Sequence, residues 1–536
     1  MKIAFFSPYQ GIWKHAQIEK QLSRILRSEK NSIEFLRCAR IYQPSCIVFT
    51  SYGIKYDDLL SEKNEICKKC ISNGDISISE YSQIELSDLL KESDKELINS
   101  CVKNLHKNDW LDFEFDSLPI GRIAAYEMFT AKKFHEKKMP ENLWPEYISK
   151  VKNALITKIS FDNYVKSRQP DVVLAYNALY SSNNVVRLIC ENKNIDFFGI
   201  HASSDIRKMY ERIVLTKDLQ ASLARNESIE WKFFEKLPLT IFQKLIVNRH
   251  LNHIKRAKSF WTYSLPISGV TPVELRNRLK IDPNRVVLLL TMSSANENMG
   301  LDLIGMYQPN SNEKMLFNSK LEMVEFLANT VAENPNYHLI IRLHPREFPN
   351  KREGLKSDFA LKFEEFSKRW KDFDGITVNL PSDNISLYDL AKIVNVVLNE
   401  ESSAGLELLL HKIPLITFSN PYFATYPREL GKRVFNKYDI LSAIEHSSNS
   451  PVSKSELEMA RKWIYFINRD ISLSIYSPID KFYFFIFNYL RKLHLFFPVV
   501  TNRIAFLLEF FFDLFFVKTN SQKAIYNIVT SETIQQ

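Results

Sequence analysis

The sequence predicts an α/β protein with two domains, each built around a mainly parallel β-sheet. The main observation is an alternation of short apolar runs with segments of helical spacing, at 171–200 and again at 285–418. Such alternation is typical of a parallel sheet with helices on its faces. A chain of 536 residues is also too long for one ordinary core. Its 45% hydrophobic and 25% charged residues are typical of a globular protein.

The first half opens with a strand, a loop and a helix. KIAFFSP is an apolar run ending in a turn, and apolar residues recur at helical spacing in HAQIEKQLSRIL. A second unit follows at 171–200, where DVVLAYN and IDFFGIH are strands flanking a helix. The lysine-rich stretch from about 38 to 150 predicts a helical insertion, and 205–262 is also expected to be helical. We therefore expect a first domain over 1–262.

The second half shows the same alternation of strands and helices more clearly. The expected strands are RVVLLLTMSS, YHLIIRLHP, ITVNLP, VVLNE and IPLITF, with helices between them. SSANEN, after the first of these strands, is interpreted as a polar loop. These elements predict a second domain over 263–430.

Residues 431–536 predict a helical extension with a phenylalanine-rich segment at 481–518. Charged residues keep every apolar run in it below the roughly 18 residues of a membrane span; they are Arg491, Lys492, Arg503, Glu509 and Asp513. This favours an amphipathic helix in the plane of a membrane surface. The alternative is that the phenylalanines pack on the two domains. The N-terminus has too short an apolar run for a signal peptide, so we expect a cytoplasmic protein, peripheral on the inner face of the cytoplasmic membrane.

Composition narrows the function further. The chain has only 12 glycines and neither a Walker loop nor a GxGxxG pattern. A net charge of +9 suits an anionic substrate or an anionic membrane surface. Because there is no RNP-like motif and no long basic tract, we expect no nucleic-acid partner.

The strongest local signal is IIRLHPRE, which places Arg342, His344, Pro345 and Arg346 at and just past the end of a strand. Ligands of open α/β sheets bind at the carboxyl ends of strands. Proline stiffens the loop, while histidine and arginine suit an anionic ligand.

A second signal lies in VVLNEESSAGLELLLHKIP, where Ser402 and Ser403 begin a helix. A helix start exposes unpaired N–H groups that bind phosphate, although these serines could simply be N-caps. Glu407, one turn later, could reach a ribose or sugar hydroxyl or be an ordinary helix residue. Ser293 and Ser294, in the SSANEN loop, could contact a pyrophosphate or sugar or form a plain turn.

A strand ending in His-Pro, followed about sixty residues later by SSxGLE and KIP, resembles the donor half of bacterial surface-polysaccharide glycosyltransferases. Similar families are capsule-synthesis transferases, bacterial sialyltransferases with HP and SS motifs, and CDP-glycerol-type polymer transferases. The resemblance implies the GT-B architecture, in which two Rossmann-like domains face a cleft. It also implies that His344 and Pro345 help bind the nucleotide and that Ser402 and Ser403 bind its phosphate. The sialyltransferases' acidic D/E-D/E-G motif does not precede the HP motif here, which leaves UDP, GDP and CDP donors open.

Glycosyl transfer to a hydroxyl uses a group that accepts its proton, which GT-B enzymes draw from the first domain. His15, in GIWKHA, and His201, at the end of IDFFGIH, are candidates for this base. Glu127, in a helical pattern, is a third. Asn177, at the end of DVVLAYN, is expected to bind a substrate hydroxyl.

Four cysteines, Cys38, Cys46, Cys67 and Cys70, fall close together early in the chain. The CxxC spacing of the last two suits zinc, which predicts a structural zinc site. The first pair is spaced too widely for a standard knuckle, so the alternative is four reduced packing cysteines.

Three functions remain open from the sequence. The first is a glycosyltransferase that moves a sugar from a nucleotide-activated donor to a lipid-linked or polysaccharide acceptor of the cell surface. It would need no cofactor and no catalytic metal, because no DxD signature follows a strand. The second is a CDP-linked polyol-phosphate transferase. The third is a non-catalytic subunit of a polysaccharide assembly complex.

Overall fold

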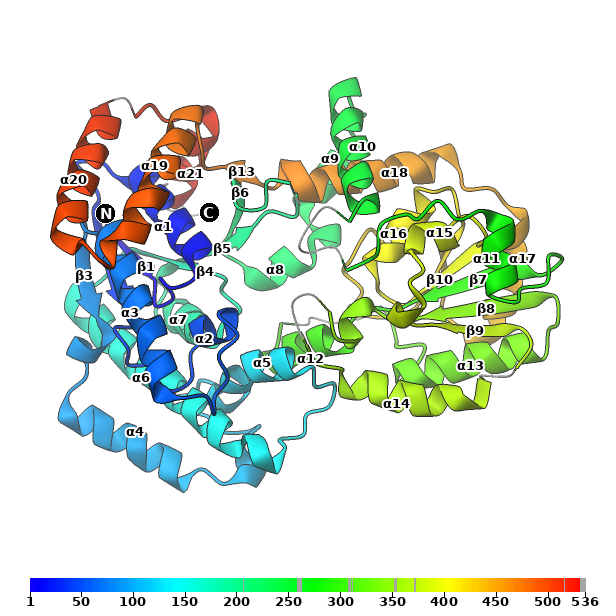
Figure 1. Ribbon diagram of the computed structural model, residues 1–536, viewed down its shortest axis with the longest axis horizontal. Coiled ribbons are helices and arrows are strands. Elements are labelled where there is room, and N and C mark those ends of the chain that lie inside the picture. The colour runs from blue at the N-terminus through cyan, green and yellow to red at the C-terminus, as the bar shows by residue number, and fades with distance from the viewer. Residues whose placement is uncertain are drawn as a thin grey trace.

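The protein has two lobes, each with a central sheet (Figure 1). The computed structural model describes residues 1–205, 207–257, 263–306, 310, 312–350, 354–370, 373–514 and 516–530. This confirms the expected α/β class with two Rossmann-like domains and a helical C-terminal extension.

The first sheet has the strand order β13-β6-β5-β4-β1-β2-β3. Strands β1 to β5 run parallel, whereas β6 and β13 pair antiparallel at one edge. The strands are β1 (Lys2–Phe6), β2 (Ser32–Arg37), β3 (Ser82–Glu85), β4 (Val172–Tyr176), β5 (Asp196–Ala202), β6 (Arg212–Thr216) and β13 (Leu473–Ser474). Apolar side chains fill a core on each face of the sheet.

Helices cover both faces of the first sheet. They are α1 (Trp13–Leu26), α2 (Ile47–Ser51), α3 (Leu60–Ser77), α4 (Glu92–Asn104), α5 (Ile120–Lys132), α6 (Trp144–Arg168) and α7 (Ser181–Asn192). The stretch 38–150 is therefore not a purely helical insertion, because it contributes β3 to the sheet. That strand is short and has no fully buried residue, which is why its apolar pattern is weak.

The second sheet has the order β12-β11-β10-β7-β8-β9, with all its pairs parallel. Its strands are β7 (Val286–Thr291), β8 (Tyr337–Arg342), β9 (Ile376–Asn379), β10 (Val396–Asn399), β11 (Leu415–Phe418) and β12 (Lys432–Val434). Its helices are α12 (Ala295–Leu303), α13 (Lys320–Ala332), α14 (Asp358–Ser367), α15 (Leu387–Leu390), α16 (Ser403–Leu409) and α17 (Ile440–Asn449). Cores again lie on both faces.

Two details of the second domain differ from the sequence prediction. Strand β12 pairs with β11 and α17 packs on both strands, so this domain continues beyond residue 430. The expected SSANEN loop begins α12, because residues from Ala295 onward pack on α5 of the first domain.

The chain crosses between the domains twice. The first crossing follows α8 (Leu219–Leu223), α9 (Ile229–Phe234) and α10 (Ile241–Lys255), and leads to α11 (Pro272–Arg278). The expected boundary at 262 lies outside the described residues. The return runs through α18 (Lys454–Tyr465) to β13, where Arg469 pairs with Asp205 at 2.9 Å.

The extension ends in α19 (Pro478–His494), α20 (Pro498–Leu514) and α21 (Asn520–Thr530). These helices lie on the first domain, at its side away from the second domain (Figure 1). Within the described part of the chain, no helix is both long and apolar enough to cross a membrane.

Glu19 is a buried carboxyl on α1 that Ser7 and Gln10 hydrogen-bond. Burial raises the pKa of Glu19 from 4.5 to about 8. The folded protein therefore holds a proton here that the unfolded chain releases, and this group's contribution to stability falls as pH rises from 4.5 to about 8.

We expect the stability of the Glu19→Gln variant not to fall in this way. Relative to the wild type, its free energy of unfolding should increase by up to about 5 kcal/mol between low and high pH. Thermal unfolding at pH of about 5 and about 8 measures this difference. Glu29→Gln, at an exposed position just after the same helix, should leave the pH dependence unchanged. Identical pH dependence of the Glu19 variant and the wild type would contradict the prediction.

Candidate functional site

The candidate site is a cleft between the two domains, with a cavity of about 730 Å³. It brings together many residues singled out in the sequence: Glu127, Asn177, Ser293, Ser294, His344, Arg346, Ser402 and Ser403. A cavity of about 230 Å³ in the second domain shares His344, Ser402 and Ser403 with it and is also lined by Arg342, Pro345 and Glu407. These three shared residues lie between the cleft and the smaller cavity at the strand ends of the second domain.

The turn carrying the two serines is held by Asn399, the last residue of β10. The Asn399 side chain donates to Ser402 O at 3.0 Å and accepts from Ser402 N at 3.2 Å. Ser402 is the N-cap of α16, and its Oγ accepts from Ala404 N at 3.3 Å. Gly405 lets the helix approach this closely, because a Cβ there would meet the Asn399 side chain at 2.7 Å. The Ser402 hydroxyl proton and the exposed Ser403 are thus available to a ligand.

His344 follows β8 and caps a single 3₁₀ turn, Pro345–Glu347. Its Nδ1 accepts from Arg346 N at 3.2 Å. Burial, with the positive charges of Lys320 and Arg342, lowers the pKa of His344 to about 4. The imidazole is therefore neutral near pH 7, and the Nδ1 hydrogen bond leaves the proton on Nε2. His344 can donate this proton to a ligand oxygen.

The two arginines of this segment are held differently. Arg342 is buried, and its Nη1 donates to Asn379 Oδ1 and to Ile385 O. Burial lowers the pKa of Arg342 to about 10, so it stays charged at the wall of the smaller cavity. Arg346 pairs with Glu297 and lines the larger cleft. Both cations can attract an anionic ligand.

Glu407 lies on α16, on the wall of the smaller cavity. Tyr388 Oη donates to its carboxyl, and burial raises the pKa of Glu407. A carboxyl at this position can bind a hydroxyl group of a ligand.

The two serines after β7 belong to a charged network at the strand ends. Ser293 N and Oγ donate to Glu400 at 3.1 and 2.8 Å, and Lys320 Nζ lies 2.8 Å from the same carboxylate oxygen. Ser294 precedes α12, and its Oγ donates to Asn296. Both serines line the cleft, but their hydroxyls already have protein partners.

Glu401 is a cleft residue that sequence reasoning missed. It lines the cleft, and its buried carboxyl accepts from Asn298 Nδ2 at 3.0 Å. Burial and the neighbouring charge of Glu400 raise the pKa of Glu401. A carboxyl that keeps its proton can donate a hydrogen bond to a phosphate or sugar oxygen. The sequence contains a signal for this role, because Glu401 directly precedes the Ser-Ser pair at the same strand end.

Glu127 is the candidate base that the structure places in the cleft. It lies on α5, and its Oε1 accepts from Ser181 N, the first residue of α7, at 2.9 Å. Lys150 Nζ lies 3.3 Å from Oε2. The carboxylate is thus held in position on the first-domain side, across from the serines and His344 of the second domain.

His15 and His201 do not lie among the described residues that line the cleft. His15 is in the first turn of α1 rather than in a loop, and its ring stacks on Tyr176 with centroids 4.0 Å apart. His201 lies within β5. Burial lowers the pKa of His15 to about 3 and that of His201 to about 4, which makes both imidazoles weak bases.

Asn177 directly follows β4 and lines the cleft, in the left-handed conformation with φ of 60°. Its Oδ1 accepts from Leu179 N at 3.3 Å, and its side chain also hydrogen-bonds Tyr180. Tyr126 and Tyr180 line the same wall. Burial raises the pKa of Tyr180 to about 12, so its phenol stays protonated.

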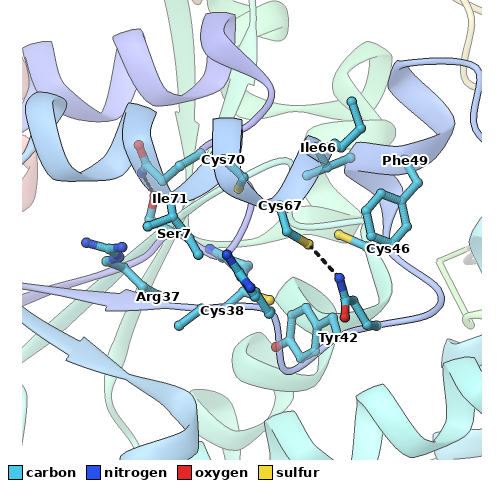
Figure 2. Close-up of a pocket in the computed structure, with 16 residues that line it drawn as sticks. Ser7, Arg37, Cys38, Tyr42, Cys46, Phe49, Ile66, Cys67, Cys70 and Ile71 are labelled. Atoms are coloured by element: carbon cyan, nitrogen blue, oxygen red, sulfur yellow. Dashed lines mark hydrogen bonds between the residues drawn. The ribbon is translucent and has the colours of Figure 1, made fainter. Parts of the chain in front are cut away.

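The four cysteines surround a separate small cavity of about 30 Å³ near β2 (Figure 2). Gln43 Nε2 donates to Cys67 Sγ at 3.2 Å, and Gly11 N donates to Cys70 Sγ at 3.0 Å. Burial raises the pKa of Cys70 to about 12 and that of Cys38 further. Among the residues that the structure describes, no group of three or more histidine, cysteine or acidic side chains is arranged to hold a metal ion. The thiols pack as free cysteines here.

Comparisons with known proteins do not assign this chain to a family. No protein-family description matches the sequence, and a search of characterised proteins gives no match. Among solved structures, the chain is similar to KpsC, a beta Kdo 2,4 transferase of Thermosulfurimonas dismutans, with 14% identity over 55% of this chain and 80% of that one and a TM-score of 0.32. It is also similar to UDP-GlcNAc 2-epimerase of Methanocaldococcus jannaschii, with 12% identity over 86% and 98% of the chains and a TM-score of 0.25. Identities and TM-scores this low say nothing about substrate, so the function rests on the cleft itself.

Proposed function

We propose that this protein is a glycosyltransferase that moves a sugar from a nucleotide-activated donor to a growing cell-surface polysaccharide. One observation carries the proposal: the cleft has hydrogen-bond donors suited to phosphate on its second-domain side and a fixed carboxylate, Glu127, on its first-domain side. Sugar transfer requires the donor and the acceptor to be bound next to each other. A cleft with these two different sides lets each domain hold one of the two substrates.

In this proposal the donor nucleotide occupies the second domain. Ser402, Ser403 and the Nε2–H of His344, which line both cavities, bind its phosphates. Arg342 supplies positive charge there, and Glu407 binds a ribose or sugar hydroxyl. These groups stabilise the negative charge that develops on the leaving nucleoside phosphate. The proposal includes no metal ion, because the sequence has no DxD signature after a strand.

The acceptor hydroxyl then lies near Glu127. The oxygen of the acceptor hydroxyl forms a bond to the anomeric carbon of the donor sugar, while the bond from that carbon to the phosphate oxygen breaks. Glu127 takes the proton of the hydroxyl, and the nucleoside phosphate leaves with the bonding electron pair. Asn177 and the protonated Glu401 orient hydroxyl and phosphate oxygens on either side of the reacting centre.

The acceptor in this proposal is a lipid-linked or polysaccharide chain, and the protein acts at the inner face of the cytoplasmic membrane. The net charge of +9 supports an anionic partner. Two other functions stay as outcomes of the tests below, namely transfer of a CDP-linked polyol phosphate and a non-catalytic role.

A thermal-shift screen against CMP, CDP, UDP and GDP tests donor binding. We expect one of them to raise the melting temperature of the wild type by roughly 2–5 °C at saturating concentration, because it binds only the folded state. The Ser402→Ala and His344→Ala variants should lose most of this shift.

Ser453→Ala is the matched control, because Ser453 is also a helix N-cap, on α18, but does not line the cleft. It should retain the nucleotide shift. If no nucleotide shifts the wild type at millimolar concentration, the proposal is wrong and the non-catalytic role is favoured. If CDP shifts it and the product contains phosphorus, the reaction is polyol-phosphate transfer.

A further inference from the structure

The C-terminal helices α19 and α20 expose a large apolar face on the first domain. Phe496 and Phe497, in the turn between the helices, are 71% and 61% exposed. Further exposed apolar side chains line both helices: Phe482, Phe485, Tyr489, Leu493, Val499, Val500, Ile504, Phe506, Leu507, Phe510 and Phe511. We call these residues, with Phe496 and Phe497, the aromatic face. Soluble proteins rarely expose so much contiguous apolar surface unless it binds a partner.

The other side of the same helices packs on the protein. Tyr483, Phe487 and Phe512 form a buried cluster with Ile76 of α3. Trp13 stacks on Phe487 with ring centroids 6.1 Å apart, and its indole nitrogen donates to Asn488 Oδ1 at 2.6 Å. The helix pair is therefore a fixed part of the first domain, and the aromatic face is the side that this packing leaves uncovered.

The acidic residues of the pair also point inward. Glu509 lies 3.3 Å from Lys20 Nζ and 3.2 Å from Arg24 Nε. Arg24 also pairs with Asp480 at 3.5 Å and with Asp513 at 3.3 Å. The carboxylates that interrupt the apolar runs in the sequence are thus neutralised against α1 and add little negative charge to the aromatic face.

The charges that remain at the outer surface near the turn are positive. Lys492 and Arg503 are both exposed, next to Leu493 and Ile504 of the aromatic face. Arg491 is held inward by Asn73 at 3.0 Å and by the Trp13 ring. An apolar surface flanked by exposed cations is complementary to a bilayer with anionic headgroups.

We propose that the aromatic face docks into the interface of an anionic lipid bilayer, with α19 and α20 lying on the membrane without crossing it. Each helix has 17 residues and is about 25 Å long, too short to span a bilayer. The phenylalanines enter the boundary between headgroups and acyl chains, while Lys492 and Arg503 contact lipid phosphates.

This inference adds a membrane-binding surface to the proposed function. It rests on that function only for the identity of the membrane. Docking through the first domain places the domain that carries Glu127 next to the lipid surface. Because α19 and α20 lie on the side of this domain away from the second domain, a lipid-linked acceptor would extend along the first domain to reach the cleft.

Vesicle flotation of the full-length protein, without nucleotide, tests the proposal. We expect the wild type to bind vesicles of phosphatidylcholine with roughly 30% phosphatidylglycerol, and to bind pure phosphatidylcholine several-fold more weakly. The Phe496→Ser/Phe497→Ser variant should lose binding to the anionic vesicles by roughly tenfold or more. Lys492→Gln/Arg503→Gln should reduce the preference for anionic vesicles.

The matched control is Phe435→Ser, because Phe435 is 63% exposed but follows β12 in the second domain. It should bind vesicles like the wild type. Equal binding by the Phe496→Ser/Phe497→Ser variant and the wild type would overturn the proposal. The proposal would also be overturned if sedimentation velocity showed a wild-type dimer that this variant converts to monomer. A second copy of the chain would then cover the aromatic face. The nucleotide-induced shift in melting temperature is measured without lipid. It therefore tests the proposed function independently of whether the protein binds vesicles.

Discussion

The Glu127→Gln variant is expected to turn over about 10²–10³-fold more slowly than the wild type, with nucleotide binding unchanged. An amide cannot accept the proton of the acceptor hydroxyl, which must then leave without a base. Donor binding should persist, because the residues proposed to bind phosphate lie in the other domain. Initial rates at saturating donor, with thermal shift by the same nucleotide, measure the two effects separately.

A structural role for Glu127 is distinguished by the thermal stability of the variant. The glutamine oxygen can still accept from Ser181 N, so the start of α7 stays capped. We expect a melting temperature close to that of the wild type, so that the loss of turnover is not explained by unfolding. Glu191→Gln, at the exposed end of α7, is the control and should keep full activity. A Glu127→Gln variant with wild-type turnover would exclude this carboxylate as the base.

The second large effect is expected at Lys133, which joins the two domains. Lys133 directly follows α5, has a fully buried side chain and adopts the left-handed conformation with φ of 60°. Its Nζ donates to three backbone carbonyls of the second domain, those of Arg346, Phe348 and Leu355. These carbonyls lie in and after the turn that carries His344, so Lys133 fixes that turn against the first domain.

We expect the Lys133→Met variant to be destabilised by about 3–5 kcal/mol, because the carbonyls of Arg346 and Leu355 lose this donor and Phe348 O keeps only the Asn350 side chain. Scanning calorimetry should show a lower melting temperature, with the domains unfolding in separate transitions. Lys132→Met, at the preceding residue, is the control, since Lys132 is partly exposed and pairs with Glu146 at 3.7 Å within the first domain. An unchanged single transition for Lys133→Met would show that this contact does not couple the domains.

Much of the second domain follows from the sequence alone. Strands β7, β8 and β10 each contain a continuous apolar run, because a parallel strand covered on both faces needs apolar residues on both of its sides. The polar residues directly after these strands necessarily meet at one edge of the sheet. His344 and Ser402 could therefore be placed near one another from strand ends alone, and the structure puts both on the same cavity wall.

Local pattern was insufficient where contacts between distant segments decide the structure. Strand β3 has a weak pattern because it lies at a sheet edge, and α12 looked like a loop because its helix is stabilised by packing on α5. Strand β12 and α17 were assigned to the extension because a three-residue strand carries almost no periodicity. The zinc site expected from the cysteine spacing stays a prediction, because spacing does not fix how the thiols of Cys67 and Cys70 on α3 point relative to those of Cys38 and Cys46.

The sequence by itself determined the α/β class, the two sheet-based halves and the strand ends of the second sheet that carry the polar residues of the candidate site, because hydrophobic periodicity and strand-end chemistry are local properties. Only the tertiary structure decided which first-domain group faces that edge, since Glu127 reaches the cleft through the packing of α5 against α7. It also decided the character of the C-terminal helices. Their acidic residues pair with cations of α1, more than 450 positions earlier in the chain, and this pairing leaves an outer face that is apolar and basic.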